Sequence, residues 1–128
     1  MGGKCIVDTN VIAKLLRSDE RSDELFEQAD EIFIPSIVVG ELYYGAHNST
    51  RVQENLKLFS DFLSQYEILD VNSSIAEVYG EIKAQLKKDG INIPENDLWI
   101  AAISKFHQYN LISFDGHFEK VDGIQVLN

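Results

Sequence analysis

The chain has 128 residues, of which 45% are hydrophobic and 25% charged, as in an ordinary globular domain. No apolar run in it approaches the roughly 20 residues that a transmembrane helix needs. The net charge of −10 and the pI near 4.6 count against a broad basic surface for nucleic acid, although acids gathered at a metal site lower the net charge without preventing local contact with phosphates. The single Cys5 excludes an internal disulfide, so we expect a packing role for its side chain and a cytoplasmic location.

Short apolar strand patterns alternate with helical patterns along the whole chain, which opens on a strand pattern and not on a signal peptide. The apolar runs predict five strands, over Lys4–Val7, Glu31–Ile34, Glu67–Val71, Leu111–Phe114 and Ile124–Leu127. Between them, helical spacing predicts six helices, over Val11–Arg17, Ser22–Asp30, Ser36–Gly45, Arg51–Ser64, Ile75–Asp89 and Asp97–Tyr109. Ser36 is the expected N-cap of the third helix, Ser73 or Ser74 caps the fifth, and Gly90 stops it. Strands separated by helices predict one α/β domain over residues 1–128, with a central parallel sheet of about five strands flanked by helices.

Four carboxylates lie within or beside apolar runs. They are Asp8 after the first strand, Glu41 inside the third helix, Asp97 before Leu98–Ala102, and Asp115 after the fourth strand. An ionised carboxylate in apolar surroundings is unfavourable unless it is paired, protonated or bound to a metal, and no basic residue recurs beside these runs. Because ligands of an open parallel sheet bind beyond the carboxyl ends of its strands, Asp8 and Asp115 are expected to meet at that edge.

Each of these acids also has an ordinary structural interpretation. A helix cap would account for Asp8, a first-turn position for Asp97, and a turn before Gly116 for Asp115. Glu41 is harder to explain in this way, because it shares a helical face with an apolar stripe and is directed inward. Independent caps and turns have no reason to converge on one sheet edge, so the joint pattern favours a common site.

Four motifs surround these acids in order along nearly the whole chain. They are Val7-Asp8-Thr9-Asn10, the stretch from Pro35-Ser36 to Glu41-Leu42 with Gly45 following, Asn96-Asp97 with Ile100-Ala101-Ala102, and Leu111-Ile112-Ser113-Phe114-Asp115. In this set the chain resembles the PIN-domain ribonucleases, and within them the VapC-type toxins of prokaryotic toxin–antitoxin pairs. The resemblance is the source of the following expectations. It implies a parallel α/β sandwich, an endoribonuclease activity, a homodimer and a small cognate antitoxin.

The resemblance also implies roles for individual residues. Its principal catalytic and metal-binding acids would be Asp8, Glu41 and Asp97, with Asp115 as a fourth acid at a more variable position. Thr9 or Ser113 would hydrogen-bond a carboxylate or a metal-bound water, and Asn10 would orient Asp8.

A divalent cation suits these residues chemically. Mg²⁺, and Mn²⁺ as an alternative, prefer oxygen ligands. A bound cation can lower the pKa of a water, orient it for attack on an RNA phosphodiester and stabilise the leaving oxygen, with one acid as a general base. The sequence leaves open whether one metal or two bind, and which RNA is cut.

Other side chains are weaker candidates. The histidines His47, His107 and His117 do not have the spacing of a zinc site; His107 is interpreted as a surface or packing residue, and His117 as a secondary candidate for substrate contact. The aromatic candidates for base stacking are Tyr43, Tyr44 and Trp99, for which the protein core or a dimer interface is favoured. The basic residues Lys14, Arg17, Lys83, Lys87 and Lys88 are interpreted mainly as solvated surface, with phosphate contact as the alternative.

A second class of function is a non-catalytic acidic metal-binding module for signalling or RNA binding. A receiver domain has this length and architecture, but it would need paired acids after the first strand and a lysine after the late strand at Asp115. A phosphatase of the haloacid-dehalogenase type would need an acid where this chain has Asn10. A catalytically silent PIN scaffold is the remaining alternative.

Overall fold

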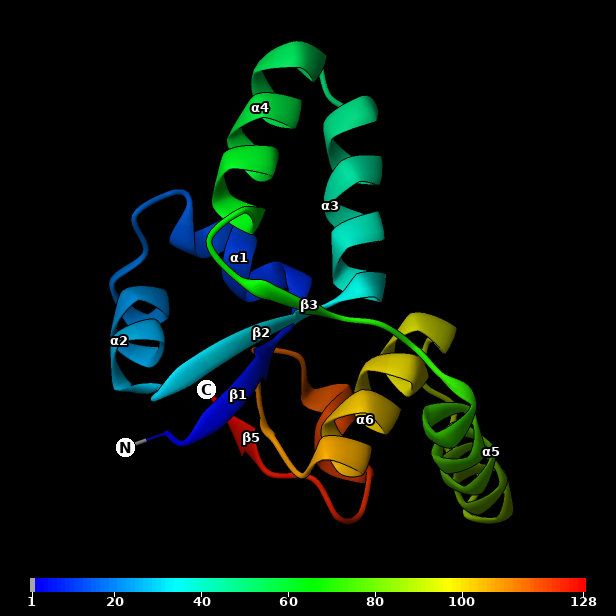
Figure 1. The fold of residues 1–128 in the computed structure, drawn as a ribbon. Coiled ribbons are helices and arrows are strands. Elements are labelled where there is room, and N and C mark those ends of the chain that lie inside the picture. Colours follow the sequence, from blue (N-terminus) through cyan, green and yellow to red (C-terminus); the bar gives the residue numbers. More distant parts are fainter. Residues whose placement is uncertain (1) are drawn as a thin grey trace.

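A five-stranded parallel sheet lies at the centre of the computed structural model, which describes residues 2–128 (Figure 1). The strands lie in the order β3-β2-β1-β4-β5, and every neighbouring pair is parallel. Their bounds are β1 Lys4–Val7, β2 Glu31–Pro35, β3 Glu67–Leu69, β4 Asn110–Ile112 and β5 Val126–Leu127. The α/β fold class expected from the sequence is confirmed.

Helices connect the strands in the described part of the chain. Their bounds are α1 Thr9–Leu15, α2 Glu20–Gln28, α3 Ser36–His47, α4 Val52–Leu63, α5 Ser73–Lys88, α6 Glu95–His107 and a short 3-10 helix, η1, Gly116–Lys120. α5 and α6 pack against each other, whereas α3 and α4 form a hairpin that projects beyond the sheet (Figure 1). None of the described helices is long and apolar enough to cross a membrane.

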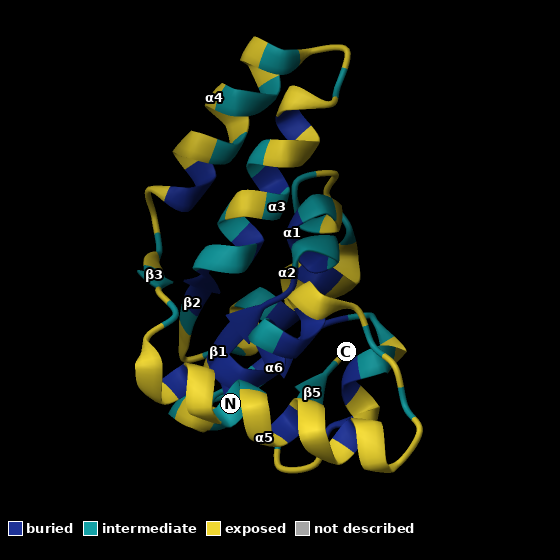
Figure 2. Cartoon of the chain, turned by 90° about the vertical axis from the view of Figure 1, so that its right-hand side faces the viewer, coloured by how far each residue is buried: buried dark blue, intermediate teal, exposed yellow. Residues whose placement is uncertain are grey.

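The central strands are the most deeply buried elements. Cys5, Ile6 and Val7 of β1 are fully buried, as are Leu111 and Ile112 of β4. Figure 2 shows buried residues along the strands and exposed residues on the outer faces of α4 and α5. A strand covered on both faces forms a continuous apolar run, which is why β1 is recognisable in the sequence. Burial raises the pKa of the Cys5 thiol to about 11, so the thiol stays protonated and has the expected packing role.

The N-cap residues of two helices differ from the sequence-based expectation. The expected cap Ser36 is the first residue of α3, and Pro35 occupies the cap position. α5 is capped by Asn72 and not by Ser73 or Ser74, because the extended Asn72 accepts a first-turn backbone N–H at 2.9 Å through its side-chain oxygen. An Asn in that position offers the acceptor that a helix N-terminus needs.

The end of α5 is predicted correctly from the sequence, whereas the short helix after β4 is missed. Gly90 ends α5 as predicted, with a φ of 70° that glycine adopts without steric strain. The helix η1 is not predicted from the sequence. Its turn is closed by the Asp115 side chain, which accepts the His117 backbone N–H at 2.9 Å, and such short helices have no apolar periodicity to reveal them.

Candidate metal centre

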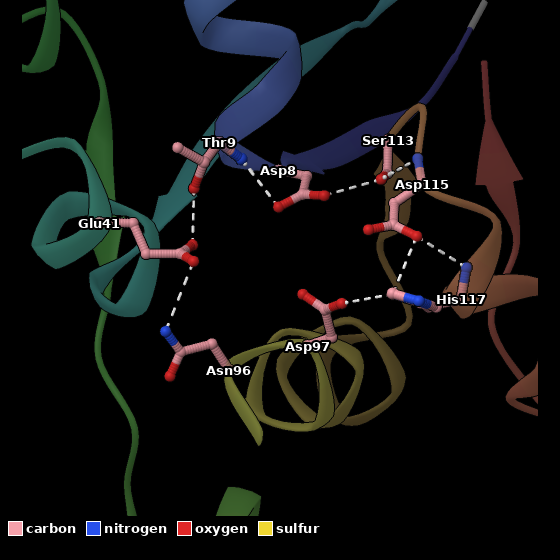
Figure 3. Close-up of polar contacts among 8 residues, drawn as sticks. All are labelled: Asp8, Thr9, Glu41, Asn96, Asp97, Ser113, Asp115 and His117. Atoms are coloured by element: carbon pink, nitrogen blue, oxygen red, sulfur yellow. Dashed lines mark hydrogen bonds and ion pairs between the residues drawn. The ribbon is translucent and has the colours of Figure 1, made fainter. Parts of the chain in front are cut away.

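Four carboxylates from four different elements surround one space beyond the carboxyl ends of the central strands (Figure 3). Asp8 directly follows β1, and Asp115 lies shortly after the neighbouring strand β4. Glu41 comes from the second turn of α3 and Asp97 from the first turn of α6. The structure thus brings together all four acids that the sequence singles out.

Asp8 is the most deeply buried of these acids, with 6% of its surface exposed. Its Oδ1 accepts the Thr9 backbone N–H at 2.8 Å, and its Oδ2 accepts the Ser113 hydroxyl at 2.8 Å. Burial, followed by the charges of Asp97 and Glu41, raises the pKa of Asp8 to about 6 even though both hydrogen bonds favour the ionised form. Repulsion between the acids therefore adds to the penalty of burying this charge.

Ser113 connects two of the acids. Besides donating to Asp8, its fully buried hydroxyl accepts the backbone N–H of Asp115 at 3.0 Å. The hydroxyl proton is donated to Asp8, because an ionised carboxylate can only accept and the Asp115 N–H can only donate. This contact agrees with the expectation that Thr9 or Ser113 would hydrogen-bond a carboxylate.

Glu41 is held by a hydrogen bond to each of its carboxylate oxygens. The Thr9 hydroxyl donates to Oε1 at 2.6 Å, and the Asn96 side-chain amide donates to Oε2 at 3.4 Å. Asn96 precedes Asp97 at the start of α6, so one helix end supplies both an acid and a support for another acid (Figure 3). The sequence gives Asn96 no such role, since the contact depends on how α3 and α6 lie relative to each other.

The role expected of Asn10 has no counterpart in the described contacts. The two hydrogen bonds that hold Asp8 come from Thr9 and Ser113. The side-chain oxygen of Asn10 is buried and has no hydrogen-bond partner within residues 2–128.

His117 joins Asp97 and Asp115 on the other side of the centre. Its Nδ1 lies 3.0 Å from Asp97 Oδ2 and 2.9 Å from Asp115 Oδ1. Asp97 is 9% exposed. Burial raises its pKa, partly opposed by the His117 hydrogen bond, while the charges of Asp115 and Glu41 act in the same direction as burial. The sequence marked His117 only as a secondary candidate, because the turn of η1 that returns its ring to the acids was not predictable.

The donor set fits a divalent cation. Within residues 2–128, none of the four carboxylates forms an ion pair with a lysine or arginine, so their mutual repulsion is offset only by hydrogen bonds and by His117. Hard divalent cations take such carboxylate oxygens, and a cation placed among them would favour the ionised forms that burial disfavours.

Removal of the Ser113 hydroxyl is expected to weaken cation binding. In Ser113→Ala, Asp8 and the Asp115 N–H each lose a partner, and the pKa of Asp8 rises further. Loss of a hydrogen bond that orients a ligand typically weakens metal affinity by about tenfold or more, which titration with Mn²⁺ measures. Ser104→Ala is the matched control, because Ser104 is equally buried but donates to the Tyr109 carbonyl at 2.7 Å, away from the acids. Equal Mn²⁺ affinity in the two variants would contradict the role of Ser113.

The aromatic residues and His107 have mixed outcomes. Trp99 stacks on Tyr79 with ring centroids 3.8 Å apart and planes at 6°, and it is partly exposed and outside the core cluster, so a dimer interface stays a prediction for it. Tyr43 is partly buried against the core. Tyr44 is 69% exposed, so a core position is wrong for this residue and a dimer interface stays a prediction. His107 stacks on a neighbouring tyrosine ring, which confirms a packing role.

Comparison with known proteins gives a consistent result. The family model of the PIN domain matches residues 5–124. "Ribonuclease VapC2" of Haemophilus influenzae is 36% identical over 98% of this chain and 97% of the relative, and "tRNA(fMet)-specific endonuclease VapC" of Salmonella typhimurium is 29% identical over 96% of each. Among solved structures, VapBC2 from Rickettsia felis bound to a promoter DNA fragment has a TM-score of 0.90 and 26% identity over 98% of both chains. DNA-bound VapBC from Salmonella typhimurium has a TM-score of 0.90 and 28% identity over 97% of this chain and 96% of the other.

Proposed function

This chain belongs to the PIN-domain family, and on that premise we propose that its acidic centre hydrolyses RNA phosphodiester bonds with a water activated by a divalent cation. The protein is an endoribonuclease of the VapC type, the toxin of a toxin–antitoxin pair. One observation carries the proposal for the site, namely the convergence on one space of four carboxylates, one directly after β1, one each from α3 and α6, and one from the turn after β4 (Figure 3). Caps and turns at four separate positions do not require such a convergence.

The roles of the residues follow from their contacts. The cation, Mg²⁺ or Mn²⁺, would be held by the four acids Asp8, Glu41, Asp97 and Asp115. When bound, it supplies a water of lowered pKa and charge stabilisation at the phosphate. Thr9 and Asn96 keep Glu41 directed at the centre, and Ser113 keeps Asp8 in place. One of the carboxylates accepts the proton of the attacking water.

Cleavage of RNA tests the proposed function directly. Total RNA from a prokaryotic cell is incubated with the purified protein and Mg²⁺ or Mn²⁺, and in parallel with a chelator. Discrete fragments that require the metal are expected, and a purified initiator tRNA is the first defined substrate to try, because the Salmonella relative is named for it. A protein that binds the metal but yields no metal-dependent fragments from either RNA would favour the non-catalytic binding module instead.

The antitoxin partner has a candidate docking place beside the acids. A groove of about 450 Å³ lies between α1, α3 and α4, and Glu41 lies on its wall. About half of the residues that line it are apolar, including Leu16, Leu42, Leu58 and Phe59, and most of the others are polar. We propose that an apolar antitoxin segment fills this groove and directs a basic side chain at the acids. The net charge of −10 favours association with a basic partner.

Leu58→Asp is expected to weaken the complex with the antitoxin encoded beside the toxin by tenfold or more, as placing a charge in an apolar contact typically does. RNA cleavage by the free toxin should not change. Leu58 is 44% exposed, and Phe106→Asp is the matched control, because Phe106 is 41% exposed at the far end of α6. Calorimetric titration compares the affinities. Unchanged affinity of Leu58→Asp would place the antitoxin elsewhere.

The proposal extends to the oligomeric state of the protein and to its location in the cell. The protein is a single PIN-like domain that acts in the cytoplasm as a homodimer. The described helices include no membrane span, which is compatible with that location. Sedimentation velocity of the purified toxin distinguishes a dimer from a monomer of 14.5 kDa.

A further inference from the structure

One side of the acidic centre contains a nitrogen donor as well as oxygen donors. Within residues 2–128, Asp97, Asp115 and His117 each offer a ligand atom, and these three atoms all lie within 4.8 Å of one another. They come from two elements, since Asp97 belongs to α6 and the other two residues belong to η1 and its cap (Figure 3).

The two separations from the His117 nitrogen match those of neighbouring ligands on one metal ion. Bonds of about 2.1 Å at right angles place two ligand atoms about 3.0 Å apart. The Nδ1 of His117 lies 3.0 Å from Asp97 Oδ2 and 2.9 Å from Asp115 Oδ1. A single proton on Nδ1 can point well at only one of these oxygens, whereas one cation can bind all three atoms.

The position of the His117 ring is fixed by contacts of its backbone and of the next residue. The Asp115 side chain accepts the backbone N–H of His117 at 2.9 Å, and the next residue, Phe118, is fully buried and anchors η1. No hydrogen bond to Nε2 is found within residues 2–128, and 40% of the His117 side chain is exposed. The ring proton can therefore reside on Nε2 in contact with water, which leaves the Nδ1 lone pair directed at the acids.

We propose that His117 is a direct metal ligand through Nδ1, so that the centre binds a first-row transition-metal ion such as Mn²⁺ in preference to Mg²⁺. Imidazole nitrogen is a good ligand for transition metals, whereas Mg²⁺ takes oxygen almost exclusively. The inference rests on the proposed function in one respect, because it takes the acids to be a metal site. It goes further in assigning a ligand that is not an acid and, with it, a metal preference.

Pulsed electron paramagnetic resonance of Mn²⁺ bound to the full, untagged chain tests the assignment. Coupling of Mn²⁺ to ¹⁴N is expected, with replacement by ¹⁵N coupling after isotopic labelling of histidine. The coupling should vanish in His117→Gln and persist in His107→Gln. His117→Gln should also weaken Mn²⁺ binding by about tenfold and change Mg²⁺ binding much less, so that the ratio of the two affinities falls.

A second variant makes the test independent of how well His117→Gln folds. The chain has three histidines, and replacing both His47 and His107 by Gln leaves His117 alone. This variant must retain the nitrogen coupling. Mn²⁺ bound by the wild type without nitrogen coupling would overturn the role of His117 and leave the acidic site standing. A wild type that binds no Mn²⁺ and no Mg²⁺ would overturn the proposed metal centre as well.

Discussion

Asp97→Asn is expected to reduce RNA cleavage by about a thousandfold or more while the protein still folds. A metal centre supplies several kcal/mol of transition-state stabilisation, and every 1.4 kcal/mol or so corresponds to a factor of ten in rate. Asp97 is nearly buried among other acids, so Asn relieves repulsion there, and under the proposed function it also removes a cation ligand. The rate of fragment formation from RNA under single-turnover conditions measures the effect, together with thermal unfolding of the metal-free protein.

The matched control for Asp97→Asn is Asp23→Asn. Both aspartates lie in the first turn of a helix, Asp97 in α6 and Asp23 in α2, where a carboxylate interacts favourably with the helix dipole by about 0.3–1 kcal/mol. Asp23 is exposed and lies outside the site. If Asp97 were only a first-turn acid, the two variants would lose similar stability and cleave RNA equally well. Wild-type cleavage by Asp97→Asn, or its failure to fold, would end the functional assignment of this residue.

The acids that follow strands were the most predictable part of the site. A continuous apolar run identifies a buried parallel strand, and the carboxyl ends of such strands share one edge. Asp8 and Asp115 were placed by this rule, and the pairing of Val7 with Ile112 brings them to neighbouring positions. Glu41 was predictable for a different reason, since a charge on the apolar face of a helix is directed inward.

The supporting contacts could not be read from the sequence. The hydrogen bond from Asn96 to Glu41 joins residues 55 positions apart and depends on how α3 and α6 lie against each other. The approach of His117 to Asp97 depends on η1, a single short turn without periodicity. The cap of α5 was also predicted wrongly. Asn72, Ser73 and Ser74 are adjacent and all carry good acceptors for a helix N-terminus, so their residue types do not distinguish the true cap, Asn72, from its neighbours.

Asp8→Asn is expected to stabilise the metal-free protein at neutral pH. The pKa of Asp8 rises from 3.8 to about 6 on folding, mainly through burial, so the folded state binds this proton more tightly than the unfolded state. The free energy of unfolding contributed by Asp8 is therefore greatest below about pH 4, falls as the pH rises to about 6, and stays low above it. The full penalty is on the order of 3 kcal/mol, and Asn avoids it but makes weaker hydrogen bonds, so a net gain of about 1–2 kcal/mol is expected.

Urea unfolding at pH 4, 5.5 and 7.5 in the presence of a chelator measures this difference. The advantage of Asp8→Asn over the wild type should be small or absent at pH 4 and grow with pH. Asp19→Asn is the matched control, because Asp19 caps α2 as Asp8 caps α1. Hydrogen bonds from Ser22 lower the pKa of Asp19, so its replacement should bring no gain at neutral pH. A clear loss of stability in Asp8→Asn at pH 7.5 would mean that Asp8 is chiefly a structural cap.

Saturating metal should reverse the order of stability of the two proteins. A ligand that binds only the folded state stabilises it by about 2.7 kcal/mol at a hundred times its dissociation constant, and the wild type should gain this stability with Mn²⁺ or Mg²⁺ at pH 7.5. Asp8→Asn should gain little, because it lacks one of the buried charges that the cation would neutralise. The same carboxylate would then destabilise the metal-free fold and stabilise the metal-bound one, a combination that a cap or a turn residue does not produce. An equal gain in both proteins would remove Asp8 from the metal centre.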